Sequence, residues 1–200
     1  MKKRTIIKKF IILSLGLLVL SAFLSGCGAP KQYTVMKSIM APRPGDAAAA
    51  AAEQQEKKDL FKGLGEPLKI AEATSSSKSD HKSGEAGSGP GPEMTIDGIG
   101  GTRWASAYED EQWLLLDLGA PKKISTVIIK WEVACARKMS VLVSNDKSNW
   151  TEVYSGGGRG SKRHDFEPVE ARYVKLDLIK RATDWGFSIW DIFVYEAGAQ

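Results

Sequence analysis

The segment RYVKLDLIK, residues 172–180, decides the fold class of this chain. Val174, Leu176 and Leu178 occupy every second position, and charged residues fill most of the positions between them. Successive side chains of a β-strand point to opposite faces, so this pattern predicts a strand with one apolar and one polar face. Such a strand packs its apolar face on a core and leaves the other face in water.

Other segments of the second half have related patterns. Segments 126–131 and 139–143 also place large apolar residues at alternate positions, and segment 188–195 carries large residues on both faces, as a strand buried on both sides would. Turn-forming clusters separate the predicted strands at residues 119–121, 145–149 and 156–160; since no helix follows the last cluster, we interpret it as a hairpin loop. No long helical period appears, so the sequence predicts an antiparallel β-sandwich or jelly roll.

Aromatic residues are concentrated in the same part of the chain. All six Trp lie in the second half of the 200 residues, which favours one folded domain at the C-terminal end. Two Cys residues in a chain of this length rule out a small domain held together by disulfides.

The first 27 residues have the organisation of an export signal. Residues 1–9 are basic, and residues 10–24 are an almost unbroken apolar run, shorter than the roughly 20 residues of a membrane-spanning helix. The run ends in Leu24-Ser25-Gly26-Cys27, which resembles the bacterial lipobox. The resemblance implies that residues 1–26 are a removed signal peptide. Cys27 then becomes a lipidated N-terminus that holds the protein at a membrane.

Two consequences follow from a lipid at Cys27. Gly28 follows it, where Asp would be the retention signal, which in a Gram-negative cell implies an outer-membrane lipoprotein. Cys135 becomes the only free thiol of the processed chain, and we expect it to be a small buried side chain. An ordinary signal peptide with a chance Cys at this position is the alternative.

The net charge takes another meaning once the signal is set aside. The whole sequence has 28 Lys and Arg against 24 Asp and Glu, a net charge of +4. Five basic residues and no acid lie within residues 1–26, so the rest of the chain has 23 basic and 24 acidic residues. A net charge of −1 gives no support for nucleic acid or another polyanion as a partner, and it suits uncharged or amino sugars.

Residues 27–64 are interpreted as a spacer. They contain six consecutive Ala residues, 47–52, and helix-tolerant residues follow, so one helix is expected near Asp46–Phe61. It has little apolar face, which indicates a stalk or a partner-docking piece; an oligomerising helix is the alternative. Residues 75–92 are rich in Ser, Gly, Lys and Pro and are expected to form an exposed loop.

A family resemblance rests on the segment Asp97-Gly-Ile-Gly-Gly-Thr-Arg-Trp-Ala-Ser106 and on further pieces in order. These pieces are Gln112-Trp113, Asp117-Leu118-Gly119, Trp131-Glu132, Val143–Asp146, Asn149–Tyr154, Ala171–Val174 and Arg181–Trp190. The ordered set resembles discoidin domains, also called coagulation factor V/VIII type C domains, whose bacterial members are family 32 carbohydrate-binding modules. The resemblance covers about residues 65–197 and implies an eight-stranded jelly roll that binds a ligand without catalysis.

The resemblance also implies the ligand residues. The members that look like chitosan- and glucan-binding modules use positions that match Arg103, Tyr108, Glu132 and Trp185. A flat aromatic ring can stack on a pyranose, and charged groups can hydrogen bond to hydroxyls or pair with an amino sugar. Structural readings stay open for each: an ion-pair partner for Arg103, a solvated aromatic for Tyr108, an edge charge for Glu132 and a core cap for Trp185.

The family also holds a structural Ca²⁺. The matching ligands here are Asp97, Thr102 and Asp191, with carbonyl oxygens near Met94 and Gly100. Oxygen ligands of this kind suit Ca²⁺.

A catalytic function is not expected. The sequence has no Gly-x-Ser-x-Gly elbow, no His-rich metal spacing and no phosphate-binding Gly loop, and His164 in the charged run 162–165 is expected to be solvated. We therefore predict non-catalytic binding of a chitosan- or glucan-like polysaccharide by a lipid-anchored protein of the cell envelope. The alternative is an envelope module that binds a protein or lipid with the same loops, which the Ala-rich spacer helix keeps open.

Overall fold

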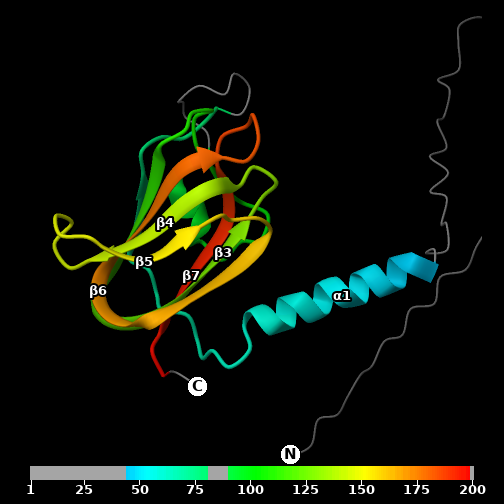
Figure 1. Cartoon of the computed structure of the whole chain (residues 1–200), viewed down its shortest axis with the longest axis horizontal. Coiled ribbons are helices and arrows are strands. Elements are labelled where there is room, and N and C mark those ends of the chain that lie inside the picture. The colour runs from blue at the N-terminus through cyan, green and yellow to red at the C-terminus, as the bar shows by residue number, and fades with distance from the viewer. Residues whose placement is uncertain (1–43, 81–89, 199–200) are drawn as a thin grey trace, which may run out of the picture. The chain divides into compact units, whose positions relative to one another are not determined.

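The computed structural model describes residues 44–80 and 90–198 (Figure 1). The signal 1–26, the lipidation residue Cys27 and the first part of the spacer lie outside the described residues. The described elements are α1 (Pro44–Leu60), β1 (Glu72–Ser75), the 3₁₀ helix η1 (Pro92–Thr95), β2 (Trp104–Ala105), β3 (Gln112–Trp131), β4 (Ala136–Ser144), β5 (Thr151–Gly156), β6 (Ser161–Arg181) and β7 (Ser188–Glu196).

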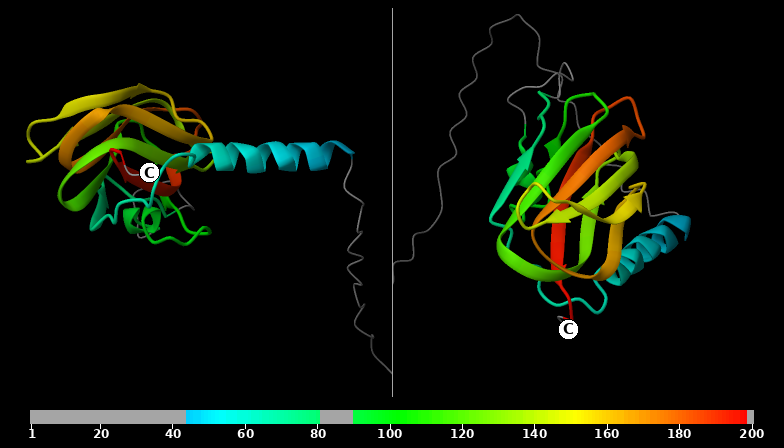
Figure 2. Two further views of the ribbon diagram at one scale, coloured as in Figure 1. Left: turned by 90° about the horizontal axis from the view of Figure 1, so that it is seen from below. Right: turned by 60° about the vertical axis from the view of Figure 1, so that its left-hand side comes forward.

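Two long bent strands join the layers of a sandwich (Figures 1 and 2). In the first layer, residues 112–117 of β3 pair with β1 and with the C-terminal half of β6, which pairs with β4, and β4 pairs with β5. In the second layer, residues 124–131 of β3 pair with β7 and with the N-terminal half of β6, and β2 pairs with β7. All these pairings are antiparallel, so the predicted antiparallel jelly-roll fold is confirmed.

The alternating segments form the core as predicted. Val174, Leu176 and Leu178 are fully buried and pack in the main apolar cluster with residues of β3, β4 and β7. Buried apolar surface contributes about 25 cal/mol per Å² to folding, so this shared cluster is the main stabilising contact between the layers. Cys135 is buried at the edge of the same cluster, as expected, and its burial raises the pKa of the thiol.

The predicted turn at residues 119–121 is instead a corner inside one strand. Strand β3 runs through it, with the pairing register to β6 shifted between Asp117 and Lys122. Gly119 has φ +80°, a conformation that Gly adopts without steric cost. The bulge bends β3 from the first layer into the second, so a turn signal marks a change of layer there.

The Gly-rich cluster at residues 156–160 is not a hairpin loop, contrary to the prediction. Strands β5 and β6 both pair with β4 and lie on opposite sides of it, so residues 157–160 connect two strands that β4 separates. A turn signal between two predicted strands indicates that both strands exist, but it does not indicate whether a third strand lies between them in the sheet. The Asn145–Asn149 turn, by contrast, does join the paired strands β4 and β5.

His164 is buried, which corrects the expectation that it is solvated. The alternation of β6 turns Arg163 and Asp165 outward, where they form an ion pair at 2.8 Å, and turns His164 inward to 4% exposure. Its ring lies 4.1 Å from the ring of Tyr154, centroid to centroid, and its Nε2 has no hydrogen-bond partner. Burial lowers the pKa of His164 to about 4. Neighbouring charges in sequence therefore gave no guide to its environment.

The predicted spacer helix is present as α1, with bounds shifted by one or two residues. Its described side chains are exposed up to Leu60, which packs with Phe61 and Leu64 against Ile128, Phe193 and Tyr195. Phe61 meets Phe193 edge to face, with ring centroids 5.7 Å apart. The end of α1 thus covers the outer face of the second layer. No helix within residues 44–80 and 90–198 is long and apolar enough to span a membrane.

Candidate functional site

The structure brings all four predicted ligand residues together. Arg103, Tyr108, Glu132 and Trp185 line one hollow of about 400 Å³ where β2 and β7 begin and β3 ends. We call this hollow the site pocket. Its remaining lining residues are Ala105, Val133, Ala134, Gly186, Phe187 and Ser188.

Trp185 presents its ring to solvent beside Tyr108. Trp185 is 59% exposed, so it does not cap the core. The Tyr108 ring meets it edge to face, with centroids 5.6 Å apart and an interplanar angle of 83°. Such pairs are favourable beyond their buried area, so Tyr108 braces the indole and leaves a broad aromatic surface at the mouth of the pocket.

Arg103 carries a polar group without a partner. Its guanidinium lies 5.3 Å from the centre of the Trp190 ring, and its buried Nε donates no hydrogen bond. No carboxylate of residues 44–80 and 90–198 forms an ion pair with it. Unpaired buried donors are rare because they forfeit hydrogen bonds to water, so this one points to a ligand acceptor.

Glu132 follows the end of β3, and one of its two carboxylate oxygens already has a hydrogen bond within the protein. Its Oε2 accepts a hydrogen bond of 3.0 Å from the backbone N–H of Ala134. Its Oε1 accepts none from the described residues, which leaves one carboxylate oxygen free for a hydroxyl or an ammonium group.

Close backbone contacts hold the loop that carries Trp185. The Ser106 N–H donates to the Phe187 carbonyl oxygen, and the Phe187 N–H donates to Ser106 Oγ, each at 2.8 Å. A Cβ at Gly186 would lie 2.5 Å from the Ser106 carbonyl oxygen, so only Gly permits this approach. The glycine therefore fixes Trp185 against the strand that follows Arg103.

Two charged residues that sequence reasoning missed support the same loop. Arg181 Nη1 donates to the carbonyl oxygens of Asp184 and Trp185 at 3.0 and 3.3 Å. Asp110 accepts from Arg181 Nε at 3.2 Å and from Lys180 Nζ at 2.6 Å. Hydrogen bonds from Lys180 and from the Arg181 backbone hold the pKa of Asp110 well below its usual range. Asp110 and Arg181 lie 71 residues apart in the sequence, so no local sequence pattern indicates that they pair.

The residues predicted for Ca²⁺ form contacts of their own. Asp97 accepts from the Ile99 N–H at 2.8 Å and from Thr102 Oγ1 at 2.8 Å. Asp191, 6% exposed, pairs with Lys130 Nζ at 3.1 Å. Within the described residues no three His, Cys, Asp or Glu side chains gather closely enough to hold a metal. Asp97 and Thr102 fit an oxygen site, whereas the Lys130 ammonium already neutralises Asp191. The calcium site stays a prediction.

Comparison with known proteins agrees with this architecture. The model of the F5/8 type C domain family matches residues 72–192, which include β1 to β6, the first part of β7 and the four predicted ligand residues of the site pocket. Polysaccharide lyase 8 family protein HylA from Enterococcus faecalis is 33% identical over 93 residues, 44% of this chain and 7% of that protein. The chain thus corresponds to a small part of that relative.

Two solved structures are carbohydrate-binding modules. Chitosan-binding module 2 of a chitosanase/glucanase from Paenibacillus sp. IK-5, in complex with chitotriose, is 36% identical and has a TM-score of 0.55; the match covers 64% of this chain and 98% of that one. The family 32 module of AlyQ, in complex with 4,5-unsaturated mannuronic acid, is 26% identical with a TM-score of 0.55, over 66% of this chain and 99% of that one. With the family model matching more than half of its length, this chain belongs to the F5/8 type C, or discoidin, domain family.

Proposed function

We propose that this chain is a non-catalytic carbohydrate-binding protein held at the cell envelope by a lipid on Cys27. The sugar binds in the site pocket. The observation that carries the proposal is the exposed Trp185 ring, braced by Tyr108, beside the unpaired buried Nε of Arg103. An apolar platform next to an unsatisfied donor matches a sugar ring, which has apolar C–H faces and a hydroxyl rim.

Each residue has a role in the proposed complex. Trp185 stacks on a pyranose face, Arg103 donates to ring or hydroxyl oxygens, and the free oxygen of Glu132 accepts from a hydroxyl or pairs with an amino group. The chitotriose complex of a relative 36% identical supports a polysaccharide ligand of the chitosan or glucan kind.

A binding experiment tests the aromatic platform. We expect the full chain, in a mild non-ionic detergent, to bind at least one of chitotriose and a β-glucan oligosaccharide by calorimetry. Trp185→Ala should weaken that binding by about tenfold or more, as is usual for a central aromatic contact. Far-UV circular dichroism and the Tm verify that the variant is folded.

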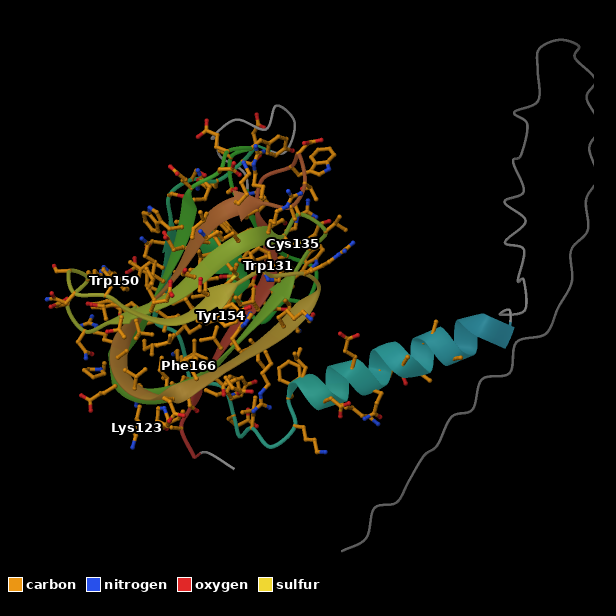
Figure 3. All side chains as sticks on the ribbon, viewed as in Figure 1. Lys123, Trp131, Cys135, Trp150, Tyr154 and Phe166 are labelled. Atoms are coloured by element: carbon orange, nitrogen blue, oxygen red, sulfur yellow. The ribbon has the colours of Figure 1, made fainter. Side chains whose placement is uncertain are left out.

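Trp150→Ala is the matched control. Trp150 lies on another side of the sandwich and outside the site pocket (Figure 3). Its loss should leave the affinity within about twofold, the usual scatter of substitutions that touch no ligand. Unchanged affinity of a folded Trp185→Ala protein would show that the sugar binds elsewhere.

Exposed apolar side chains favour a second candidate, docking to a lipid or protein surface. Val133 is 75% exposed beside Trp185, and Ile99 is 58% exposed on the loop before Arg103. Ile99→Ser should leave sugar binding intact under our proposal, because Ile99 does not line the site pocket. Sedimentation with phosphatidylglycerol vesicles that is lost in Ile99→Ser, combined with an empty glycan screen, would instead identify a lipid-docking module.

The lipid anchor has its own test. The wild-type chain, expressed in a bacterial host, should incorporate radiolabelled palmitate and sediment with the envelope, in the outer-membrane fraction of a Gram-negative host. Cys27→Ala should lose the label, because the thiol that carries the lipid is absent. Labelling that survives the substitution would exclude Cys27 as the acceptor.

A further inference from the structure

A second hollow lies beside the site pocket and has a different chemistry. It measures about 880 Å³, and Glu132 and Val133 line both hollows, so the two form one continuous surface. Its floor is Trp131, Cys135 and Ala136, which are buried. We call it the basic groove, because three cationic side chains line it: Arg137, Arg159 and Lys162.

The three cations come from three different parts of the fold. Arg137 is on β4, Lys162 is on β6, and Arg159 is on the connection between β5 and β6. All three are exposed. None of the three side chains has a hydrogen bond or ion pair within the described residues, whereas the side chains of Arg163, Arg172, Lys180 and Arg181 all pair with acids.

Two glycines bring the cations to one groove. The Gly158 N–H donates to the Ala136 carbonyl at 2.9 Å, which fastens the connection to the start of β4. A Cβ at Gly158 would lie 2.3 Å from Trp131 Nε1, and one at Gly157 would lie 3.0 Å from the Arg137 carbonyl oxygen. Side chains at these positions would push the connection away, so the glycines keep Arg159 and Lys162 near Arg137.

The groove is therefore a concentrated positive charge in a chain whose net charge beyond residue 26 is −1. Glu132 is its one acidic lining residue, and it lies at the junction with the site pocket. Arg137 also borders a further hollow with Asp110 and Asp184, but Asp110 is already paired with Lys180 and Arg181. Like charges around one hollow repel one another unless an anion offsets them.

We propose that the basic groove is a second subsite that binds an acidic unit of the same polysaccharide whose neighbouring unit stacks on Trp185. The proposal rests on the carbohydrate-binding function and names its substrate class: a polymer that carries carboxylate or sulfate groups. Arg137 and Arg159 can each form charge-assisted hydrogen bonds with such a group, and Lys162 adds a point charge.

Glu132 sets the position of the acidic unit. Its carboxylate repels an anion at the junction, so the anionic group lies beyond Glu132, among the three cations. A polymer in which acidic and uncharged sugars alternate meets both requirements, because the uncharged sugar can occupy the site pocket. Hyaluronan is a probe of this type, and its methyl ester has the same backbone without the charge.

The test compares acidic polymers with their esters. Binding of the full chain to hyaluronan, alginate and polygalacturonate, and to an ester of each, is measured by biolayer interferometry at low salt, with chitosan as a further ligand. We expect at least one acidic polymer to bind about tenfold more tightly than its ester. Raising the salt to about 0.3 M should remove most of this preference, because salt screens exposed charges.

Variants assign the preference to the groove. Arg137→Gln/Arg159→Gln/Lys162→Gln should reduce the acid-over-ester ratio from about tenfold to below about twofold. Arg137→Lys/Arg159→Lys/Lys162→Arg keeps the charge and should retain most of the ratio, which guards against an effect of folding.

The matched control removes the same charge elsewhere. Lys69→Gln/Lys122→Gln/Lys123→Gln takes three cations from the far end of the sandwich, where Leu68 bonds to Val194 and Lys123 to Ala197 at the end of β7. Lys123 lies well away from Trp131 and Cys135 (Figure 3). This control should keep the ratio; an equal loss in it would show that net charge, not the groove, attracts the polymer.

The outcomes separate the two proposals. Equal binding of acid and ester, or a ratio that survives the triple Gln substitution, overturns the second subsite. Binding of chitosan alone, lost on Trp185→Ala, overturns it while the carbohydrate function stands. No binding of any polymer overturns the carbohydrate function and the subsite that rests on it.

Discussion

The loop of Trp185, residues 183–187, and the loop of Asp97, residues 97–102, hold their polar groups in opposite ways. The Trp185 loop is fixed from outside, by Ser106 and Arg181, and leaves its large side chain exposed. The Asp97 loop satisfies itself, since Asp97 accepts from Ile99 and Thr102 of the same loop. A loop braced by its neighbours can present a side chain to a ligand, whereas a self-satisfied loop keeps its shape without one.

The two loops also differ in the space around their glycines, and this gives the largest predicted effect. Gly186→Ala places a Cβ 2.5 Å from the Ser106 carbonyl oxygen, so we expect the free energy of unfolding to fall by about 3 kcal/mol. A Cβ at Gly100, in the Asp97 loop, meets no atom within 4 Å, so Gly100→Ala should change stability by less than about 0.5 kcal/mol. Urea denaturation measures both. Similar losses would mean that the Trp185 loop is not tightly docked.

Acid separates overall stability from the order of the Trp185 loop. The neutral form of His164 is favoured in the fold because its pKa is lowered from 6.5 to about 4. Because the unfolded chain binds a proton at His164 more readily than the folded chain, protonation favours unfolding. The fold therefore has its full stability above pH 6.5 and loses part of it as the pH falls toward 4. From pH 7 to pH 5 the free energy of unfolding should fall by about 2 kcal/mol through this residue.

His164→Phe is the comparison variant, since a phenyl ring keeps the contact with Tyr154. Its unfolding free energy should depend less on pH between 7 and 5 than that of the wild type. Affinity for an uncharged β-glucan oligosaccharide should stay constant over this range, because the lowered pKa of Asp110 keeps the carboxylate that holds Arg181 ionised. Parallel pH profiles of the two proteins would contradict the assignment to His164.

Arg181→Gln tests whether bracing from outside is what orders Trp185. The substitution removes the donors to the Asp184 and Trp185 carbonyl oxygens and leaves the site pocket without a change in its own lining. We expect sugar affinity to fall about fivefold and the free energy of unfolding to fall by about 1 kcal/mol. Thr102→Val, which removes a donor of the Asp97 loop, should leave sugar affinity unchanged. A smaller fall in sugar affinity for Arg181→Gln than for Thr102→Val would show that Arg181 does not order Trp185.

Calcium gives the smallest predicted effect. Because Lys130 already neutralises Asp191, we expect saturating Ca²⁺ to raise the Tm of the wild type by only about 2 °C, and chelator to reverse it. Lys130→Gln frees Asp191 and should enlarge the shift, whereas Asp97→Asn should abolish it. Differential scanning fluorimetry measures all three. Equal shifts in the wild type and Asp97→Asn would exclude the Asp97 loop as the binding site.

The predicted ligand residues of the site pocket were easier to identify from the sequence than the residues that hold the Trp185 loop in place. Arg103, Tyr108, Glu132 and Trp185 could be named because each falls in a recognisable motif, and the structure places all four in one pocket. Arg181 and Asp110 were missed because residues that only hold a loop in place belong to no sequence motif. A charged residue at the end of β6 has the pattern of a solvated residue until its partner is known. The burial of His164 was missed for the same reason.

By itself, the sequence determined the alternating strand segments at 126–131, 139–143, 172–180 and 188–195, and its motifs named four of the residues that line the site pocket, because alternation and motifs are local. Tertiary structure alone decided that 119–121 is a corner, that β4 separates β5 from β6, and that Lys130 neutralises Asp191. It also gathered Arg137, Arg159 and Lys162 around one groove. The net charge of −1 beyond the signal does not say where the charges lie. The order of the strands brings three cations that are separated in the sequence to one groove.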